Sequence, residues 1–363
     1  MKKYKVLTVV GARPQFVKAA ALSREFQKRK NFEEILVHTG QHFDENMSEI
    51  FFDEMQIPKP KYNLEINSLS HGAMTGRMLE GIEEILLQEK PDMLLVYGDT
   101  NSTIAGALAA KKLHIPVAHV EAGLRSFNIK MPEEVNRILT DRISDILLCP
   151  TDTAIENLKN EGYDTIDTVV AKSGDVMQDA AEYYALTSES KSSIVKDLKL
   201  IKDEFALITL HRAENTDDPE RLKSIVEGLV EINESCKVVI PLHPRTKIKL
   251  ESFGIELPLT VIDPVGYFDM IELLKNCRFV ATDSGGLQKE AFFFAKPCIT
   301  MRDETEWVEL VKGNYNTIVG ANKNKLIEAY KDLQSVDCDF SVDLYGGGNA
   351  CKNIVDLISK HLE

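Results

Sequence analysis

Carboxylates that could transfer protons follow short apolar runs in this 363-residue chain. Asp99 and Glu121 each come almost directly after such a run, and Glu133 lies a little further along. A carboxylate at the end of a buried strand is unfavourable unless it is paired or used in chemistry. Two interpretations stay open. Either Asp99 caps a helix and Glu121 pairs with Arg125 or Arg137, or the carboxylates act as acid and base.

A glycine-containing turn near the start of the chain could bind an anion. Arg13 follows Gly11, and Lys18 comes about one turn into the helix expected next. Backbone amides exposed at a helix start favour negative charge, and the two cations would add to it. The alternative is an ordinary turn with a solvated arginine. The run is neither G-x-G-x-x-G nor a Walker A loop, so NAD and P-loop nucleotide chemistry lack their usual support.

A second turn of this kind lies in the other half of the chain. Ser284, Gly285 and Gly286 place bare backbone amides at the start of a predicted helix, an arrangement suited to a diphosphate. Glu290, about one turn later, could accept hydrogen bonds from a ribose diol. The alternative is a glycine-rich N-cap that binds no ligand.

The elements that must position these residues alternate along the whole chain. Short β-branched runs separated by helical patterns predict βαβ units and parallel sheets that are covered on both faces. His211 and His243 follow two of these runs, as the carboxylates do. Strands are expected at 5–10, 34–39, 93–97, 117–120, 146–149, 168–171, 205–210, 237–241, 259–262, 279–282 and 298–300.

The fold class predicted from this alternation is α/β, with two doubly wound Rossmann-like domains that face each other across a cleft. We place the first domain, with the carboxylates, at 1–175 and the second at 176–348. A final helix at about 349–363 is expected to pack back on the first domain. The ligand is expected beyond the carboxyl ends of the strands, in the cleft.

Composition narrows the class of partner. The chain has 43 Lys and Arg against 57 Asp and Glu, a formal charge of −14, which argues against nucleic acid and anionic membranes as partners. Its six cysteines show no paired spacing and indicate a reduced, cytoplasmic protein rather than a disulfide framework or a zinc site. No stretch approaches the roughly 18–20 apolar residues of a membrane span. We predict no metal and no cofactor.

Taken together, these residues resemble the non-hydrolysing UDP-N-acetylglucosamine 2-epimerase family. The resemblance covers essentially the whole chain in order, through VVGARPQFVKAA, VHTGQHFDENM, VYGDTNST, HVEAGLRS, MPEEVNR, SGDVMQDA, HRAENTD, PLHPRT, DPVGYFDM, TDSGGLQKEA, MRDETEW and YGGGNA. It implies the GT-B two-domain fold, a cytoplasmic homodimer, and interconversion of a UDP-HexNAc with its C2 epimer for surface-polysaccharide precursors. It also implies the route: elimination of UDP to a 2-acetamidoglucal, then reprotonation and return of UDP.

The resemblance assigns roles to the candidate residues. Asp99, Glu121 and Glu133 would act at the sugar, and His211 would lie beside the diphosphate or transfer a proton. The remaining substrate-binding residues, for phosphate, ribose and orientation of the acids, are Arg13, Lys18, Arg137, His243, Phe268, Ser284, Gly285, Gly286 and Glu290. Which carboxylate is base and which is acid stays open.

The start of the chain departs from the best-known members. They carry Gly-Thr-Arg-Pro-Glu where this chain has Gly-Ala-Arg-Pro-Gln, ending at Gln15. GARPQF, SHGAMTGRML and DETEWVEL are closer to the branch that acts on UDP-2,3-diacetamido-2,3-dideoxyglucuronate. Some members bind a second UDP-GlcNAc as an allosteric activator, and Gln41 and His42 match part of that segment. The alternatives are a hydrolysing epimerase that releases UDP and ManNAc, a GT-B glycosyltransferase, and a nucleotide-sugar-binding regulator without turnover.

Overall fold

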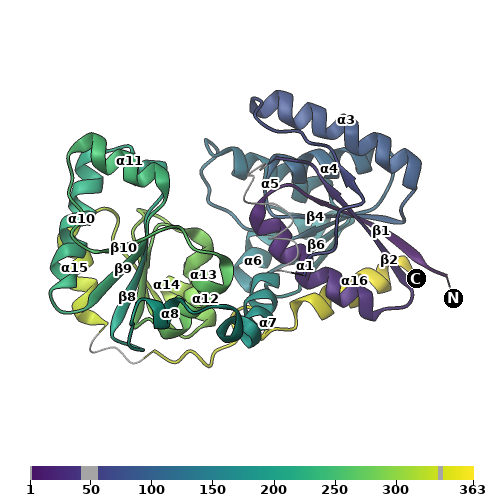
Figure 1. Cartoon of the computed structure of the whole chain (residues 1–363). Helices are drawn as coiled ribbons and strands as arrows, with labels where there is room; N and C mark the ends of the chain where they lie inside the picture. The colour runs from purple at the N-terminus through teal and green to yellow at the C-terminus, as the bar shows by residue number, and fades with distance from the viewer. Residues whose placement is uncertain (1, 42–55, 334–337) are drawn as a thin grey trace. The chain divides into compact units, whose positions relative to one another are not determined.

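Two compact units make up the chain in the computed structural model, which describes residues 2–41, 56–333 and 338–363 (Figure 1). The N-terminal unit comprises Met1–Ala180 and Asp343–Glu363, and the C-terminal unit comprises Ala181–Val342. The division therefore falls inside helix α7 (Val176–Lys191), slightly later than the predicted boundary between 175 and 176. The C-terminal unit also ends earlier than 348.

A seven-stranded parallel sheet forms the centre of the N-terminal unit, in the order β3-β2-β1-β4-β5-β6-β7. Its inner strands are mostly apolar, as expected where helices cover both faces of a sheet. The strands are β1 (Tyr4–Val10), β2 (Phe32–His38), β3 (Tyr62–Asn63), β4 (Met93–Tyr97), β5 (Val117–Val120), β6 (Ile146–Cys149) and β7 (Val169–Lys172). The helices are α1 (Arg13–Lys28), α3 (His71–Glu89), α4 (Asn101–Lys112), α5 (Pro132–Ile143), α6 (Asp152–Asn160) and α16 (Ala350–Leu362), with a 3-10 turn at Tyr163–Thr165.

The last helix, α16, packs on this first unit beside α1 (Figure 1). The Asp179 carboxylate accepts hydrogen bonds from the backbone N–H groups of Ala350 and Cys351, at 3.0 and 2.8 Å, and so caps the start of α16. Arg29, directly after the end of α1, pairs with Asp356 on α16 at 2.7 Å. These contacts explain why the chain returns to the first unit after building the second.

The C-terminal unit repeats the plan with a six-stranded parallel sheet, in the order β10-β9-β8-β11-β12-β13. Its strands are β8 (Phe205–Thr209), β9 (Lys237–Pro241), β10 (Thr260–Ile262), β11 (Phe279–Thr282), β12 (Cys298–Thr300) and β13 (Asn316–Ile318). Its helices are α8 (Ile194–Asp197), α9 (Ala213–Thr216), α10 (Pro219–Asn233), α11 (Pro244–Phe253), α12 (Tyr267–Asn276), α13 (Gly285–Phe293), α14 (Val308–Lys312) and α15 (Lys323–Asp332).

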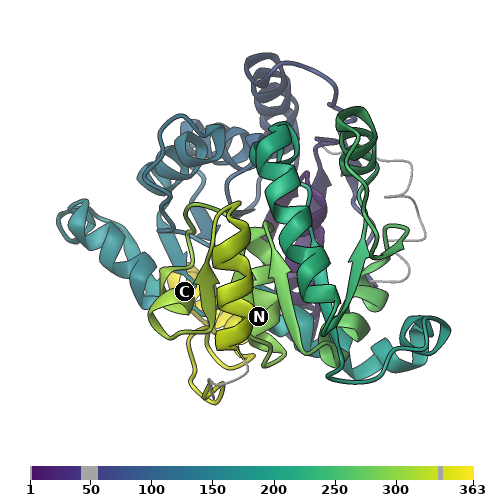
Figure 2. The same ribbon diagram turned by 90° about the vertical axis from the view of Figure 1, so that its left-hand side faces the viewer.

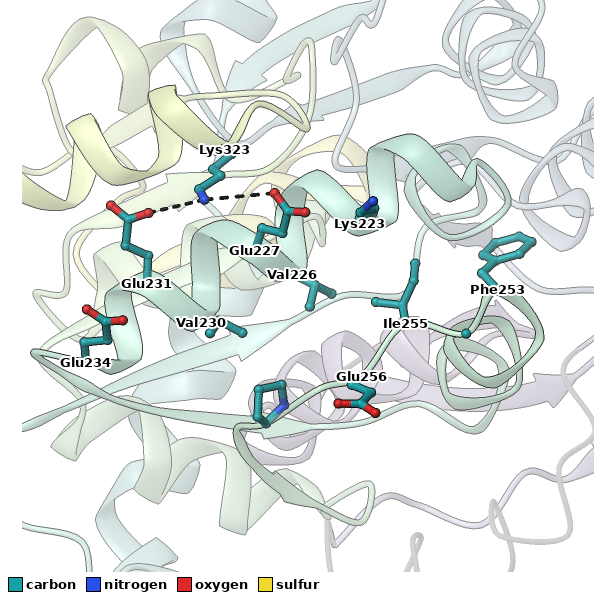
Figure 3. Close-up of a pocket in the computed structure, with 12 residues that line it drawn as sticks. Lys223, Val226, Glu227, Val230, Glu231, Glu234, Phe253, Ile255, Glu256 and Lys323 are labelled. Carbon is teal, nitrogen blue, oxygen red and sulfur yellow. Dashed lines mark ion pairs between the residues drawn. The ribbon is translucent and has the colours of Figure 1, made fainter.

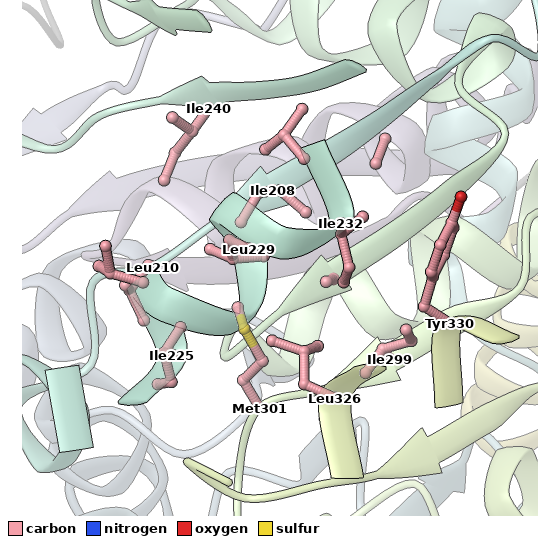
Figure 4. Close-up of a cluster of buried hydrophobic side chains, with 14 of the residues drawn as sticks. Ile208, Leu210, Ile225, Leu229, Ile232, Ile240, Ile299, Met301, Leu326 and Tyr330 are labelled. Atoms are coloured by element: carbon pink, nitrogen blue, oxygen red, sulfur yellow. The ribbon is translucent and has the colours of Figure 1, made fainter. Parts of the chain in front are cut away.

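Helices α10 and α15 lie side by side on one face of this second sheet (Figure 2). Their apolar side chains meet those of the strands in one buried cluster, which Figure 4 shows around Leu229 and Met301. Burial of one such aliphatic side chain contributes about 1.5–3 kcal/mol, so this cluster supplies the second unit with a core of its own.

The fold class and most of the expected strands are confirmed. The strands at 93–97, 117–120, 146–149, 237–241, 279–282 and 298–300 have the predicted bounds, and the others differ by a few residues. The hydrophobic pattern did not single out β3, β13 or α3. The two β-strands are short, and α3 contains Gly72, Gly76 and Gly81, which weaken a helix signal.

Strand order fixes where a ligand can bind in each unit. In the first sheet the strand order reverses between β1 and β4: β2 and β3 lie on one side of this pair, and β5 to β7 lie on the other. In the second sheet the order reverses in the same way between β8 and β11. Ligands of open α/β sheets bind beyond the carboxyl ends of the strands at such a switch point. The segments that follow these four strands carry Arg13, Asp99, His211 and Ser284. Glu121 and His243 follow the neighbouring strands β5 and β9 instead.

Candidate active site

The first switch point brings the turn after β1 against the turn after β4. Gly11 follows β1, and a Cβ atom there would lie 2.1 Å from Ser102 Oγ and 2.3 Å from Thr39 Oγ1. Glycine is thus required by close approach of side chains. Gln15 reinforces the same turn, because its Oε1 accepts from the Gly11 N–H at 2.8 Å and its Nε2 donates to the Tyr97 carbonyl at 2.7 Å.

Asp99 follows β4 and pairs with Arg137, which is buried on α5. The Asp99 side chain keeps 29% of its surface exposed. Burial is the largest cause that raises the pKa of Asp99 above its ordinary value; Arg137 and Lys18 oppose the rise, and the negative charge of Glu121 adds to it. Asp99 is therefore a carboxyl group that takes up a proton more readily than an ordinary aspartate, a property of acid–base catalysts.

Glu121 follows β5 in a strained conformation. Its φ angle is +73°, which is left-handed and unfavourable by about 1–2 kcal/mol for a residue with a Cβ atom. Its carboxylate pairs with Lys18 of α1, and both side chains are nearly buried. Strain of this kind persists where the surrounding structure enforces it, often at functional sites.

The partner of Glu121 differs from the first interpretation of the sequence. Lys18 pairs with it, whereas Arg125 bonds Asp141 at 2.7 Å and Glu161 at 2.7 Å. Arg137 bonds Asp99 and Glu134. The carboxylates are therefore in ion pairs, as the first interpretation expected, but Arg125 binds Asp141 and Glu161 rather than Glu121.

Glu133 and Glu134 have opposite surroundings on the first turn of α5. Glu133 is exposed and makes no hydrogen bond or ion pair with any residue that the structure describes. Glu134 is buried and accepts from the backbone N–H groups of Ser126, at 3.0 Å, and Phe127, at 2.9 Å. Burial would raise the pKa of Glu134, but these bonds and Arg137 outweigh it and hold the pKa below its ordinary value. Glu134 is thus an ionised group that fixes the loop and Arg137, a role that the sequence alone did not indicate.

Arg13 and Gln41 border the same turn. Arg13 is exposed at the first position of α1. The Oε1 atom of Gln41 accepts from Ser102 Oγ at 2.7 Å, next to Gly11. His42, the other residue of the predicted allosteric segment, lies outside the described residues.

The second switch point pairs His211, after β8, with Asp283, after β11. His211 Nδ1 lies 3.2 Å from Asp283 Oδ1, and the His211 side chain is 44% exposed while that of Asp283 is fully buried. Burial would raise the pKa of Asp283, but its bonds with the His211 side chain and with the N–H groups of His211 and Arg212 hold the pKa below its ordinary value. The ionised Asp283 fixes the proton of His211 on Nδ1, which leaves Nε2 as the reactive nitrogen.

The start of α13 has the features of an anion-binding helix end. Ser284 is its N-cap, and in the part of the chain that the structure describes its side chain makes no capping hydrogen bond. Apart from its chain neighbours and the adjacent backbone of α13, no described atom lies within 4 Å of a Cβ atom built on Gly286. Arg302 is buried nearby: its Nη1 would lie 3.7 Å from a Gly285 Cβ atom and donates to Glu306 at 2.8 Å. The amides, the open approach and a fixed cation together suit a phosphate group.

The other predicted binding residues of the C-terminal unit lie on neighbouring elements. Glu290 is mostly buried on α13 and accepts from Tyr267 Oη at 3.2 Å. Phe268 is buried with its ring edge-on to Tyr184, at a centroid distance of 5.8 Å. His243 is exposed at the N-cap of α11, where its Nδ1 accepts from the Arg245 N–H at 3.2 Å. Phe268 is therefore a packing residue in this structure, and its role toward substrate stays a prediction.

Two surface hollows differ in their relation to these residues. One, of about 440 Å³, lies between the starts of α3 and α5 and is bordered by Asn101 and Asn136. Asn136 Nδ2 donates to the Asp99 carbonyl at 3.0 Å, so this hollow adjoins the first site. The other, of about 660 Å³, lies along α10, where Figure 3 shows Val226 and Val230 among acidic side chains. It contains none of the candidate residues.

Within residues 2–41, 56–333 and 338–363, no three or more His, Cys, Asp or Glu side chains cluster as metal ligands would. In the same ranges no helix combines the length and the apolar composition needed to cross a membrane.

Known proteins match the chain over nearly its full length. The family model for UDP-N-acetylglucosamine 2-epimerase matches residues 24–359. The UDP-2,3-diacetamido-2,3-dideoxy-D-glucuronate 2-epimerase of Pseudomonas aeruginosa is 56% identical, over 98% of this chain and 99% of that protein. The crystal structure of the Methanocaldococcus jannaschii UDP-GlcNAc 2-epimerase with UDP-GlcNAc and UDP superposes with a TM-score of 0.88, at 42% identity, covering 98% of this chain and 99% of that one. The Neisseria meningitidis UDP-GlcNAc 2-epimerase bound to UDP-GlcNAc gives 0.87 at 30% identity, covering 98% and 100%.

The fold and its matches define an α/β isomerase of the GT-B-like architecture. The chain belongs to the UDP-N-acetylglucosamine 2-epimerase family. The resemblance noted in the sequence is thereby confirmed, whereas the individual site residues remain predictions.

Proposed function

We propose that this protein is a non-hydrolysing 2-epimerase of a UDP-linked 2-acetamido sugar. The observation that carries the proposal is that each unit has its own set of candidate residues, and that the two sets suit different chemistry. The N-terminal unit offers Asp99 and Glu121 with fixed cations, and the C-terminal unit offers the α13 amides with Arg302 and His211. The first set suits proton transfer, and the second suits a diphosphate.

The reaction needs the leaving group to depart first. The hydrogen at C2 is barely acidic because this carbon carries an amide nitrogen and no carbonyl group. Breakage of the bond between C1 and the UDP oxygen makes C1 electron-deficient and acidifies the neighbouring C–H. One carboxylate takes the C2 proton, and a 2-acetamidoglucal and UDP result. A proton then returns to the opposite face of C2, and UDP re-forms its bond to C1.

The steps of this reaction give each candidate residue a role. Asp99, Glu121 and Glu133 are the candidate acid and base, and Lys18 and Arg137 orient the first two. The start of α13 and Arg13 would hold the phosphates, with His211 Nε2 beside the leaving oxygen. Glu290 would accept the ribose hydroxyl groups. UDP must stay bound while the glucal exists, which favours a closure step during turnover.

The substrate that the sequence favours is UDP-2,3-diacetamido-2,3-dideoxyglucuronate or its C2 epimer. The support is the 56% identity to the Pseudomonas aeruginosa enzyme that is named for this sugar. UDP-GlcNAc, which is bound in the neighbouring crystal structures, is the second candidate.

A product analysis tests both the reaction and the sugar. The enzyme is incubated with each UDP-sugar separately, and the products are identified by proton NMR and mass spectrometry. The expected result is a C2 epimer of unchanged mass, formed faster from the diacetamido uronate. Release of free UDP with a free amino sugar would instead indicate the hydrolysing epimerase. Binding without any conversion of either sugar would indicate a regulator.

Gly286→Ala provides a test of the diphosphate site. A methyl group fits there in the folded protein, since no described atom beyond the adjacent backbone lies within 4 Å. It would, however, occupy the space that a phosphate oxygen needs. We expect the affinity for UDP, measured by calorimetry, to fall at least about tenfold, with the melting temperature unchanged or slightly higher. Gly76→Ala on α3 is the matched control, because described atoms also leave its Cβ position open. Equal affinities for UDP in both variants would contradict the site.

The assembly and location are proposed on the family resemblance. We propose a homodimer in the cytoplasm. The six cysteines all lie among the described residues and form no disulfide, which supports this compartment. A second UDP-GlcNAc near Gln41 and His42 is proposed as an activator on the same basis. Analytical ultracentrifugation tests the homodimer, and an activity titration with UDP-GlcNAc tests the activator.

A further inference from the structure

A buried chain of polar side chains lies beneath the two catalytic turns of the N-terminal unit. Its centre is His119, inside β5, and Asp141, on α5, both with no exposed side-chain surface. His119 Nδ1 lies 2.7 Å from Asp141 Oδ1. His119 Nε2 lies 2.7 Å from the carbonyl oxygen of Gly98, the residue immediately before Asp99.

The partners determine which atoms carry protons. A carbonyl oxygen only accepts, so Nε2 carries a hydrogen and donates it to Gly98. A proton must also lie between Nδ1 and Asp141, because two lone pairs 2.7 Å apart would repel each other. Both sides of the ring are thus engaged, and His119 has one fixed orientation.

The same anchor reaches the turn that carries Glu121. The other carboxylate oxygen of Asp141 accepts from the Gly123 N–H at 3.1 Å and from Arg125 Nη1 at 2.7 Å. Gly123 comes two residues after Glu121, whose left-handed φ of +73° needs a cause outside the residue itself. Asp141 holds the chain just beyond this strained residue, and His119 holds the chain just before Asp99.

We propose that His119 is a positioning residue that fixes Asp99 through the Gly98 carbonyl, with Asp141 fixing the Glu121 turn from the same buried pair. The proposal rests on the proposed function for its effect on turnover, but not for its effect on the turn. A carboxylate displaced by about 1 Å can lose about 100-fold in rate, so loss of this anchor affects kcat. Affinity for UDP, which we assign mainly to the start of α13 together with Arg13, is expected to stay unchanged.

Two substitutions of His119 test its two hydrogen bonds separately, because each keeps one bond and removes the other. The side-chain amide nitrogen of glutamine reaches the place of Nε2, and that of asparagine reaches the place of Nδ1. His119→Gln therefore keeps a donor to the Gly98 carbonyl and loses the bond to Asp141, whereas His119→Asn does the reverse. A general loss of stability would lower kcat in both variants. The melting temperature of each variant measures that loss.

The experiment measures kcat, KM and UDP affinity for the two variants, together with hydrogen exchange of the peptide that spans Gly98 and Asp99. We expect His119→Asn to lower kcat about 10- to 100-fold and to speed exchange in that peptide. His119→Gln should stay within about threefold of wild type in kcat and in exchange. UDP affinity should be unchanged in both.

Equal losses of kcat in the two variants, or no loss in either, would overturn the proposal. If the wild-type protein does not epimerise any UDP-sugar, the proposed function fails, and the exchange measurement still decides the role of His119. Faster exchange near Gly98 in the asparagine variant alone supports the anchor in that case. Equal exchange in both variants refutes it.

Discussion

Asp99→Asn and Glu121→Gln are each expected to lower kcat for epimerisation by at least about 100-fold, the lower end for a general acid or base. Both substitutions keep the shape of the side chain and remove its ability to exchange a proton. Asp99 and Glu121 occupy neighbouring turns, and the charge of Glu121 already raises the pKa of Asp99. A carboxyl group with a raised pKa beside a second carboxylate suits an acid and a base that act on opposite faces of a sugar.

The control is another carboxylate-to-amide change outside the site. Glu234 lies at the end of α10 and lines the hollow along that helix, so Glu234→Gln should leave kcat unchanged. Each variant is checked for its melting temperature and for UDP binding, because both should stay near wild type. Near-wild-type turnover in both Asp99→Asn and Glu121→Gln would remove these residues as catalysts.

Glu133→Gln tests the third candidate carboxylate, and comparison with Glu134→Gln distinguishes Glu133 from its neighbour on α5. Glu133 is exposed without a partner among the described residues, so the substitution should cost no stability, and a loss of at least about 100-fold in kcat would reflect chemistry. Glu134→Gln should lower the melting temperature, because its carboxylate binds two backbone N–H groups and Arg137. If only Glu134→Gln lost activity, Glu133 would be no catalyst.

Arg137→Met is expected to lower kcat about 10- to 100-fold and to move the pH profile. Arg137 bonds both Asp99 and Glu134 from a buried position, and a charge-assisted bond contributes about 1.5–3 kcal/mol. Arg137 lowers the pKa of Asp99 against the larger effect of burial, so its removal raises that pKa further. The limb of the pH profile that Asp99 governs then moves to higher pH. This holds for the acid limb if Asp99 is the base, and for the alkaline limb if it is the acid.

Arg137→Lys keeps this test decisive if the methionine variant folds poorly. Lysine retains the positive charge but lacks the planar fork that serves two carboxylates at once. Its pH limb should stay close to that of wild type, while kcat falls through the lost geometry. A profile that is unchanged in Arg137→Met would contradict control of Asp99 by Arg137.

The sequence predicted the strands and the turns after them because both signals are local. Buried parallel strands are apolar runs, and turns before helices carry glycine, proline or an N-cap residue. The end of β4 and the start of α13 could be read in this way. α3 was not identified, because its three glycines blur the helical pattern.

Pairings between distant residues could not be read from the sequence. Lys18 and Glu121 are 103 positions apart, and only the order of strands β1, β4 and β5 brings their turns together. His119 gave no signal because it lies within an apolar strand, where a histidine resembles a packing residue. Arg302 was missed for a similar reason: its relation to Gly285 depends on the pairing of β11 with β12.

Turnover in D2O tests the central claim most directly, that UDP leaves and the C2 proton is exchanged with a protein carboxyl group. The preferred UDP-sugar is incubated with the wild-type enzyme, and C2 of the recovered substrate and product is examined by NMR. We predict deuterium at C2 of both epimers and none in the absence of enzyme. Conversion to the epimer with the original hydrogen retained at C2 would contradict the mechanism and the roles of Asp99 and Glu121.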